Sequence, residues 1–254
     1  MPTTTIYYCH WKVFPDKVDD CLTLFGSMDD EADKQSWGPD VEMIGMWLGS
    51  AHGCAICRAK DAVPVLNWVL SWAPMADISV TPMLDDNEVK AIVLKGEPAP
   101  FQMRYDPEGE AREGESLYWI RYSIQPGKRV ETYATFAKMT EAESKANIGD
   151  MRFLGRYHNL GLGCGMAMVA SKTSAAVHQH VYNWAAMVDC DVLAVGTTHV
   201  ARQMIRDKPG FEHKLRALRT KMGIPETPLK SVVAGAAKPQ TKSAALPKEA
   251  QPAH

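Results

Sequence analysis

The chain has 254 residues, of which 46% are hydrophobic and 23% are charged, and its formal net charge is -2 with a pI near 6.4. These values are typical of globular proteins and give no whole-chain reason to expect binding to nucleic acid or to a membrane. No apolar stretch approaches the roughly 18 residues of a spanning helix, and the N-terminus lacks the apolar core of a signal peptide. We therefore expect a soluble, cytoplasmic protein.

The six cysteines do not form a dense disulfide framework. They lie mostly inside apolar runs, which predicts reduced core residues. The segment from His52 to Cys57 resembles a metal-binding motif, but strand alternation would send Cys54 and Cys57 to opposite faces. We therefore predict no metal site, and no cofactor is predicted either.

The first elements of the chain occur twice. Residues 7–13 and 118–124 are aromatic-rich runs that predict strands, and a proline ends each of them. Apolar residues at helical spacing follow, including Phe25 in the first copy and Phe136 in the second. Residues 43–56 and 153–166 then predict hairpins, in which glycine precedes an aromatic residue by two positions and Gly-Cys starts the return strand.

The later elements also repeat. A second helix is predicted around 65–72 and 177–184, a fourth strand at 78–83 and 190–195, and a short amphipathic segment at 87–93 and 199–205. Each copy thus follows the β-α-β-β-α-β order of a ferredoxin-like unit, which leaves one face of its four-stranded sheet uncovered. Two such faces in one chain are expected to pack together or to close into a barrel.

These patterns give the expected domain organisation. We predict a first unit at 5–93, a Pro- and Gly-rich linker at 94–116, a second unit at 117–205, a C-terminal helix at 206–224 and a low-complexity basic tail at 225–254. From Arg206 onward the chain is net basic, so this end could dock on an acidic partner or on the chain's own acidic face, or serve solubility alone.

The order of these landmarks resembles the dimeric α/β-barrel superfamily and, within it, an uncharacterised family of small bacterial single-unit proteins. The resemblance rests on Trp-Lys-x-x-Pro-x-Lys from Trp11, Gly-x-Trp from Gly45, Gly-Cys at Gly53 and Trp-x-x-Met-x-Asp from Trp72. It implies an α+β fold in which two tandem ferredoxin-like units form a pseudo-dimeric α/β barrel. Members of that superfamily include cofactor-free monooxygenases, haem-handling enzymes and isomerases, so the resemblance does not select a function.

Strand alternation predicts which side chains enter the barrel, because one face of each sheet must pack on its helices. The predicted interior residues with chemistry to offer are Tyr8, His10, Trp119, Arg121, Arg152, Arg156, His158 and Met166. The second copy gathers the arginines, whose charge in a partly dry interior needs an acidic side chain such as Glu42, or a bound carboxylate or phosphate.

Two functional hypotheses remain open. The first is a cavity for an anionic, partly apolar small molecule, with Tyr8, Trp119, Arg121, Arg152, Arg156 and Met166 as ligand contacts. His158 or His10 would then move a proton in a cofactor-free oxidation or isomerisation, if the protein is an enzyme at all. The alternative is a structural or assembly subunit that binds proteins, or further copies of itself, through its outer face and basic tail. A large interior void favours the ligand, and a filled interior favours assembly.

Overall fold

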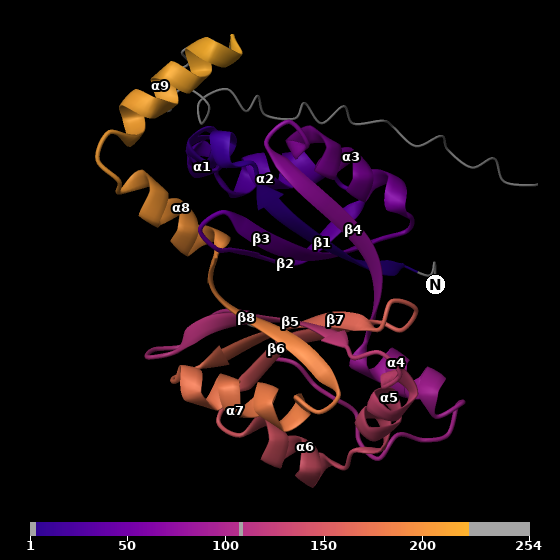
Figure 1. Ribbon diagram of the computed structural model, residues 1–254. Coiled ribbons are helices and arrows are strands. Elements are labelled where there is room, and N and C mark those ends of the chain that lie inside the picture. The colour runs from indigo at the N-terminus through magenta and orange to yellow at the C-terminus, as the bar shows by residue number, and fades with distance from the viewer. Residues whose placement is uncertain (1–3, 107–108, 224–254) are drawn as a thin grey trace, which may run out of the picture.

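The computed structural model describes residues 4–106 and 109–223, which form a barrel of antiparallel strands with helices on its outside (Figure 1). The first half comprises β1 (Thr5–Val13), a short 3-10 turn (Pro15–Lys17), α1 (Val18–Ser27), α2 (Asp30–Trp37), β2 (Val41–Leu48), β3 (His52–Ala59), α3 (Ala62–Trp72), β4 (Ala76–Asp85) and α4 (Asp86–Val93). The second half comprises β5 (Ser116–Ile124), α5 (Arg129–Lys138), α6 (Glu141–Ile148), β6 (Arg152–Asn159), β7 (Cys164–Ser171), α7 (Ser174–Trp184), β8 (Val188–Thr197) and α8 (Thr198–Arg206). Helix α9 (Phe211–Met222) follows.

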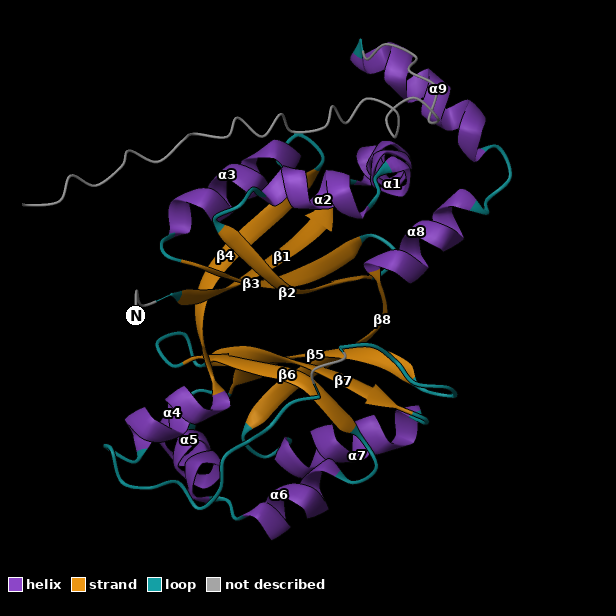
Figure 2. Cartoon of the chain, turned by 180° about the vertical axis from the view of Figure 1, so that it is seen from behind, coloured by secondary structure: helices purple, strands orange, loops and turns teal. Residues whose placement is uncertain are grey.

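The strands close in the order β1-β3-β2-β8-β5-β7-β6-β4. Pairing is extensive within each half, whereas two short seams join the halves: β2 meets β8 at Trp47 and Leu48, and β4 meets β6 at Leu84 and Asp85. The two sheets face each other and the helices cover their outer faces (Figure 2). The predicted pseudo-dimeric α/β barrel of two tandem ferredoxin-like units is therefore correct.

Helices α2 and α6 were not predicted from the sequence. Both are polar and carry no apolar stripe that helical spacing could reveal, and their start signals are caps instead. The Asp29 carboxylate accepts a hydrogen bond from the Ala32 backbone, and Thr140 forms a capping box with Glu143. These caps satisfy amides that a short helix would otherwise leave unpaired.

The repeated Gly-x-aromatic sequence is explained by a β-bulge in each half. The register of β2 against β3 shifts between Met43 and Gly45, and that of β6 against β7 shifts between Phe153 and Gly155. A Cβ atom on Gly45 would collide with the ring of Trp47, and one on Gly155 would lie 2.8 Å from the ring of Tyr157. Only glycine leaves room for these rings, which turn into the barrel.

The barrel interior is filled by side chains from both sheets. Its buried cluster consists of Ile6, Trp47, Cys54, Ile56, Met83, Leu117, Trp119, Leu154, Tyr157, Met166, Met168 and Ala170, with Tyr8, Leu193 and Val195 packed against it. The interior placement of Tyr8, Trp119 and Met166 is confirmed. That of Arg156 and His158 is wrong, because the bulge before them reverses the alternation and turns both toward the helices.

The last helix of each half packs on the other half. Helix α4 packs on α5 of the second half, where Val89 contacts the cluster of Tyr133 and Phe136. Helix α8 packs on α1 of the first half, and the guanidinium of Arg202 there pairs with Asp30 and Asp33 of α2. Figure 1 shows both helices beyond the sheet from which they emerge.

Helix α9 also packs on the first half, where it contacts α1. Lys214 lies 2.9 Å from a carboxylate oxygen of Asp19, and Lys221 lies 2.6 Å from one of Asp20. Of the alternatives left open for the basic C-terminal region, α9 shows docking on the chain's own acidic face, whereas the predicted tail at 225–254 lies outside the described residues. None of the described helices combines the length and apolarity needed to cross a membrane.

Candidate functional site

A cavity of about 70 Å³ lies in the second half, between the outer face of the sheet and helices α5 and α7. It is lined by Ile120, Tyr122, Thr132, Tyr133, Phe136, Arg156, His158, Ala167, His180, Val181, Trp184, Val188 and Cys190. Most of these side chains are apolar or aromatic, and the polar ones converge from three strands and two helices. We call this space the relay cavity, after the hydrogen-bonded chain in its wall.

The chain begins at Asp86, which the first half contributes. Asp85 ends β4 at the seam with β6 and caps α4, so that Asp86 becomes the first residue of the helix and is fully buried. Both of its carboxylate oxygens accept hydrogen bonds from Arg156: Nε lies 2.9 and 3.1 Å from them, and Nη2 lies 2.6 Å from Oδ2. This bidentate geometry makes a strong charge-assisted contact.

His158 connects this ion pair to the cavity wall. Its Nε2 lies 2.6 Å from Oδ1 of Asp86, and its Nδ1 is hydrogen-bonded to the hydroxyl of Tyr122. A carboxylate can only accept, so Nε2 carries the ring proton and Nδ1 accepts from the phenol. Tyr122, His158 and Asp86 therefore form one directed chain, which we call the relay.

The charges of the relay follow from burial and from Arg156. Burial alone would raise the pKa of Asp86, but Arg156 and His158 outweigh it and hold that pKa below its usual range. Burial lowers the pKa of His158 despite the Asp86 carboxylate, so the imidazole is neutral at pH 7. Burial also raises the pKa of Tyr122 well above its usual value, so its hydroxyl keeps its proton.

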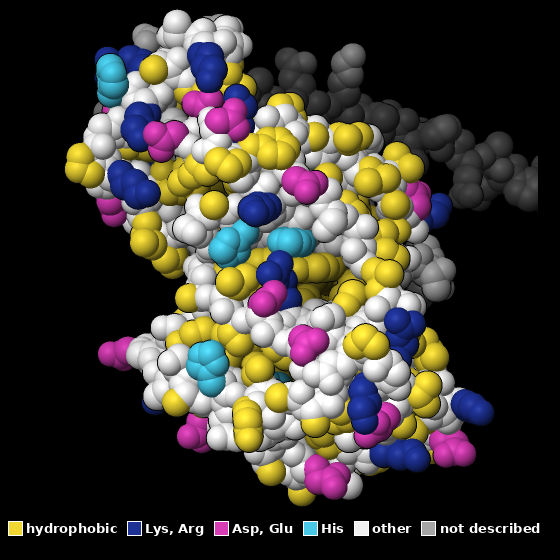
Figure 3. Space-filling model, in the orientation of Figure 1, with side chains coloured by type: hydrophobic (Ala, Val, Ile, Leu, Met, Phe, Trp, Pro, Cys, Tyr) yellow, Lys and Arg dark blue, Asp and Glu magenta, His cyan; other side chains and the backbone are white. Residues whose placement is uncertain are grey.

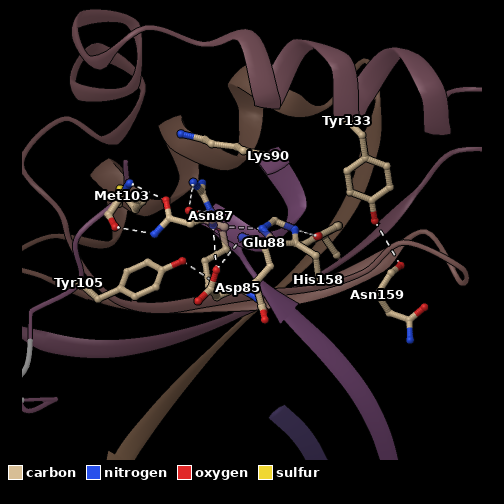
Figure 4. Close-up of polar contacts among 12 residues, drawn as sticks. Asp85, Asn87, Glu88, Lys90, Met103, Tyr105, Tyr133, His158 and Asn159 are labelled. Carbon is tan, nitrogen blue, oxygen red and sulfur yellow. Dashed lines mark hydrogen bonds and ion pairs between the residues drawn. The ribbon is translucent and has the colours of Figure 1, made fainter. Parts of the chain in front are cut away.

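Aromatic rings and the linker hold Arg156 in place. Its guanidinium carbon lies 4.8 Å from the ring centre of Phe136 and 4.9 Å from that of Phe153, and the hydroxyl of Tyr105 donates to its carbonyl at 2.9 Å. In Figure 4, His158 lies between the N-terminal end of α4 and Tyr133. The side chain of Arg156 therefore has little freedom to move away from Asp86.

Two further groups face the cavity. The hydroxyl of Tyr133 donates to the Asn159 carbonyl at 3.2 Å, and burial raises the pKa of Tyr133 to about 12. His180 of α7 bonds through Nδ1 to the Asn147 carbonyl at 3.0 Å, and burial lowers its pKa to about 4. His180 is thus a second neutral imidazole beside the relay.

The first half has an equivalent cavity of about 60 Å³ between its sheet and α1, α2 and α3. The matched register of the two hairpins places Met46 where the second half has Arg156, and Leu48 where it has His158. Trp11, which pairs with Gly53, stands where Tyr122 pairs with Gly165. The first-half cavity is therefore mainly apolar and contains no counterpart of the relay.

The residues that the sequence grouped together divide into separate places. Arg156 and His158 belong to the relay cavity, whereas Tyr8, His10, Trp119 and Arg121 lie toward the barrel interior on the other face of the sheets. Met166 is fully buried in the interior core. Their roles as ligand contacts or catalytic groups stay predictions.

Arg152 lies apart from both groups. Its guanidinium pairs with Asp106 and Glu115 of the linker, each at 2.6 Å. The hydrogen bond from Arg152 holds the pKa of Glu115 at about 2. Arg152 thus fastens the linker to β6.

Sequence reasoning missed Asp86, Tyr122, Tyr133 and His180 as site residues. Tyr122 follows Arg121 in its strand, so alternation places it on the helix side, where an aromatic residue is indistinguishable from core packing. An available signal was the mismatch between the copies: the first copy has Asp85-Asp86 after its last strand and the second has Thr197-Thr198, whereas Arg156 and His158 of the second copy stand opposite Met46 and Leu48 of the first. Opposite charges in complementary copies indicate contact across the halves.

A haem does not fit the relay cavity. Its volume is well below the roughly 300–1,000 Å³ of pockets that hold drug-sized ligands. Both ring nitrogens of His158 already have partners within the relay. The cavity therefore has room only for a molecule much smaller than haem.

Several solved structures are similar to this chain at low sequence identity. A dye-decolorizing peroxidase from Bacteroides thetaiotaomicron VPI-5482 matches with a TM-score of 0.49 and 11% identity over 79% of this chain and 95% of its own. DyPB from Rhodococcus jostii RHA1 matches with a TM-score of 0.46 and 7% identity over 80% and 95%. A candidate monooxygenase from Lactobacillus acidophilus NCFM matches with a TM-score of 0.43 and 11% identity over 77% and 97%.

No curated protein matches the chain by sequence. The family model described as a domain of unknown function, DUF3303, matches it twice, at residues 6–97 and 116–208. Together the two matches cover most of the chain and correspond to the two halves of the barrel. The protein therefore belongs to the DUF3303 family and carries two tandem copies of its domain.

Proposed function

We propose that the relay cavity binds a small, largely apolar molecule and that the relay removes a proton from it. The observation that carries this proposal is the directed chain from Tyr122 through His158 to Asp86, which ends at the wall of an otherwise apolar cavity. Buried titratable groups in such a chain are typical of acid-base sites. The proposal gives His158 the proton-transfer role expected from the sequence, but in the relay cavity instead of the barrel interior.

The proton moves in two linked steps. An acidic proton of the bound molecule passes to the oxygen of Tyr122, while the phenolic proton passes to Nδ1 of His158. The imidazole becomes imidazolium, still bonded through Nε2–H to the ionised Asp86, and the bound molecule becomes an anion. The carboxylate stabilises the imidazolium, as in other histidine-centred relays. Return of the proton to another atom of the molecule completes an isomerisation.

Arg156 supports the relay but does not attract the ligand. Its charge is balanced by Asp86 at 2.6 to 3.1 Å, so it keeps that carboxylate ionised. The cavity itself then has no spare positive charge among the residues that line it. We therefore propose a neutral substrate for this site, in place of the anionic one expected from the sequence.

Hydrogen exchange tests the proposal without knowledge of the natural reaction. The protein is incubated in D₂O with small carbonyl compounds that carry an acidic C–H bond, and deuterium incorporation is followed by NMR. We expect catalysed exchange that falls by about 10²-fold or more in Tyr122→Phe and His158→Gln. Trp11→Phe, the equivalent change in the first half, should leave the rate unchanged. Exchange that is insensitive to both relay variants would refute the proposal.

An assembly role is the second candidate function, and two observations favour it. The barrel interior is filled, and α3 carries an outward apolar stripe of Val63, Leu66 and Leu70, which are 62%, 43% and 64% exposed. Such stripes often mark protein contacts. Sedimentation velocity tests this: a concentration-dependent dimer that Leu66→Asp abolishes would support self-assembly, and a monomer at all concentrations would oppose it.

A further inference from the structure

Buried polar atoms without partners gather at one place in the barrel interior. In residues 4–106 and 109–223, the buried side-chain atoms that lack a hydrogen-bond partner are the Tyr8 hydroxyl, Nε1 of Trp119, Nε of Arg121 and Nε of Arg202. Arg202 lies elsewhere, between α8 and α2, and is paired with carboxylates. The other three belong to β1 and β5, which are not paired with each other but meet across the barrel interior, and their convergence needs an explanation.

These atoms surround one end of the interior, which we call the barrel mouth (Tyr8, His10, Trp119 and Arg121). The Trp119 side chain is fully buried; its ring centre lies 5.2 Å from that of His10 and 6.3 Å from that of Tyr8. The guanidinium carbon of Arg121 lies 5.1 Å from the Trp119 ring, and its Nη1 is 3.4 Å from Nε2 of His10. Figure 3 shows histidine and basic side chains beside a hollow between the two halves.

The barrel mouth has more donors than acceptors, because its acceptors are the Tyr8 hydroxyl, whose pKa is raised by burial and lowered to a lesser extent by the Trp119 N–H, and Nε2 of His10 near Arg121. Indole Nε1–H and guanidinium Nε–H can only donate, and the Tyr8 hydroxyl can donate as well. The carboxylate paired with Arg121 is Asp191, 2.7 Å from Nη2, and it lies on the solvent side with 66% of its side chain exposed. Burial and Arg121 both lower the pKa of His10, so this ring adds no second positive charge beside Arg121.

We propose that the barrel mouth binds a small oxyanion, such as the carboxylate of a short organic acid. One water molecule offers two lone pairs and no charge, whereas an oxyanion offers several acceptor sites and places a negative charge beside Arg121, whose partner Asp191 is largely exposed to solvent. The Nε1–H of Trp119 and the Nε–H of Arg121 would donate to it, with Tyr8 as a third donor and His10 at the rim. This site is separate from the relay cavity, because Arg121 and Tyr122 are adjacent in β5 and point to opposite faces.

The test follows the indole N–H signal of Trp119 in ¹⁵N-labelled full-length protein during titration with sodium acetate and, separately, with sodium phosphate. Trp119→Phe identifies the signal by its loss. We expect a saturable shift with at least one of the two anions, and weaker binding by about tenfold or more in Arg121→Gln. Arg58→Gln is the matched control, since Arg58 is also a strand arginine with an acidic partner, Glu42.

Three results would overturn the proposal. The first is a shift that never saturates, or one that sodium chloride reproduces equally, which would indicate nonspecific charge effects only. The second is an affinity unchanged in Arg121→Gln. The third is a Trp119 signal that stays unmoved while calorimetry detects binding, because the anion would then lie elsewhere. If Arg121→Gln fails to fold, calorimetry on Trp119→Phe decides: an affinity equal to that of wild type would refute the site.

Discussion

The two sheet–helix cavities occupy equivalent places and are built from different chemistry. In the first half, Trp11, Met46 and Leu48 line the space, and its neighbouring ion pair, Arg202 with Asp33, belongs to the helices that cover it. In the second half, the corresponding strand positions hold the relay and Arg156. The same backbone therefore supports either a packed apolar site or a charged one, and the difference resides in a few side chains at one seam.

The largest expected effect comes from removing the carboxylate at that seam. Asp86→Ala leaves the buried guanidinium of Arg156 unpaired, and we expect a loss of about 3–5 kcal/mol in the free energy of unfolding. The matched change in the first half, Thr198→Ala at the start of α8, should cost less than about 1 kcal/mol. Urea denaturation of both variants measures the contrast, and equal losses would contradict the asymmetry between the halves.

A triple variant serves as the control for this experiment. Asp86→Thr, Arg156→Met and His158→Leu together give the relay site the residues that stand at the equivalent positions around the first-half cavity, namely Thr198, Met46 and Leu48. Replacing a buried ion pair by apolar groups is often neutral or stabilising, so the triple variant should be more stable than Asp86→Ala alone. A triple variant as unstable as the single one would show that the surrounding packing, and not the unpaired charge, causes the loss.

The next effect concerns pH. His180 has a folded pKa of about 4 against about 6.5 in the unfolded chain, so between these values the unfolded chain binds more protons and stability falls on acidification. The loss from this group reaches about 3 kcal/mol by pH 4. The lowered pKa of His158 acts in the same direction, whereas Asp86, whose pKa is also lowered, matters only below about pH 4.

The pH experiment again uses matched positions. His180→Phe should flatten the dependence of unfolding free energy on pH between about 7 and 4. Trp68→Phe, the change at the equivalent helix position of the first half, should leave the slope as in the wild type. Part of the slope should remain in His180→Phe because of His158, whereas a slope as steep as in the wild type would assign the pH dependence to other groups.

The smallest effect sharpens the comparison by removing a feature that the halves share. Asp85 caps α4 and Thr197 caps α8, each through a side-chain oxygen that accepts from the helix backbone. Asp85→Ala and Thr197→Ala should each cost about 1 kcal/mol. If the two variants lose similar free energy of unfolding in thermal or urea denaturation, the halves differ only in the buried site. A much larger loss in Asp85→Ala would show that the helix caps differ as well.

The fold could be predicted because its signals are local and occur twice. Alternation in strands one and three correctly placed Tyr8, Trp119 and Met166 in the interior, where each strand keeps a regular pleat. The prediction for β6 was wrong because the extra residue of the bulge before Arg156 exchanges the inward and outward faces of the strand from that point on. A single sequence does not show that a strand contains such an extra residue. The sequence showed Gly45 and Gly155 as a repeated motif, but it did not show that each lies at a β-bulge.

The site could be predicted only in part, for a different reason. His158 and Arg156 were recognised as chemically active, but their partner Asp86 lies 70 and more residues away and meets them through closure of the barrel. The local sequence around Asp85 is typical of a helix N-cap, but it does not indicate on which half α4 packs. The relay is thus a property of the closed topology.

The exchange of α4 and α8 makes the halves mutually dependent. A fragment ending before α4 would deprive the second half of its buried carboxylate, and a fragment ending before α8 would expose the apolar side of α1. Both exchanged helices form an ion pair with the half that they cover, Asp86 of α4 with Arg156 and Arg202 of α8 with Asp33, so each half contains charges whose partners lie in the other.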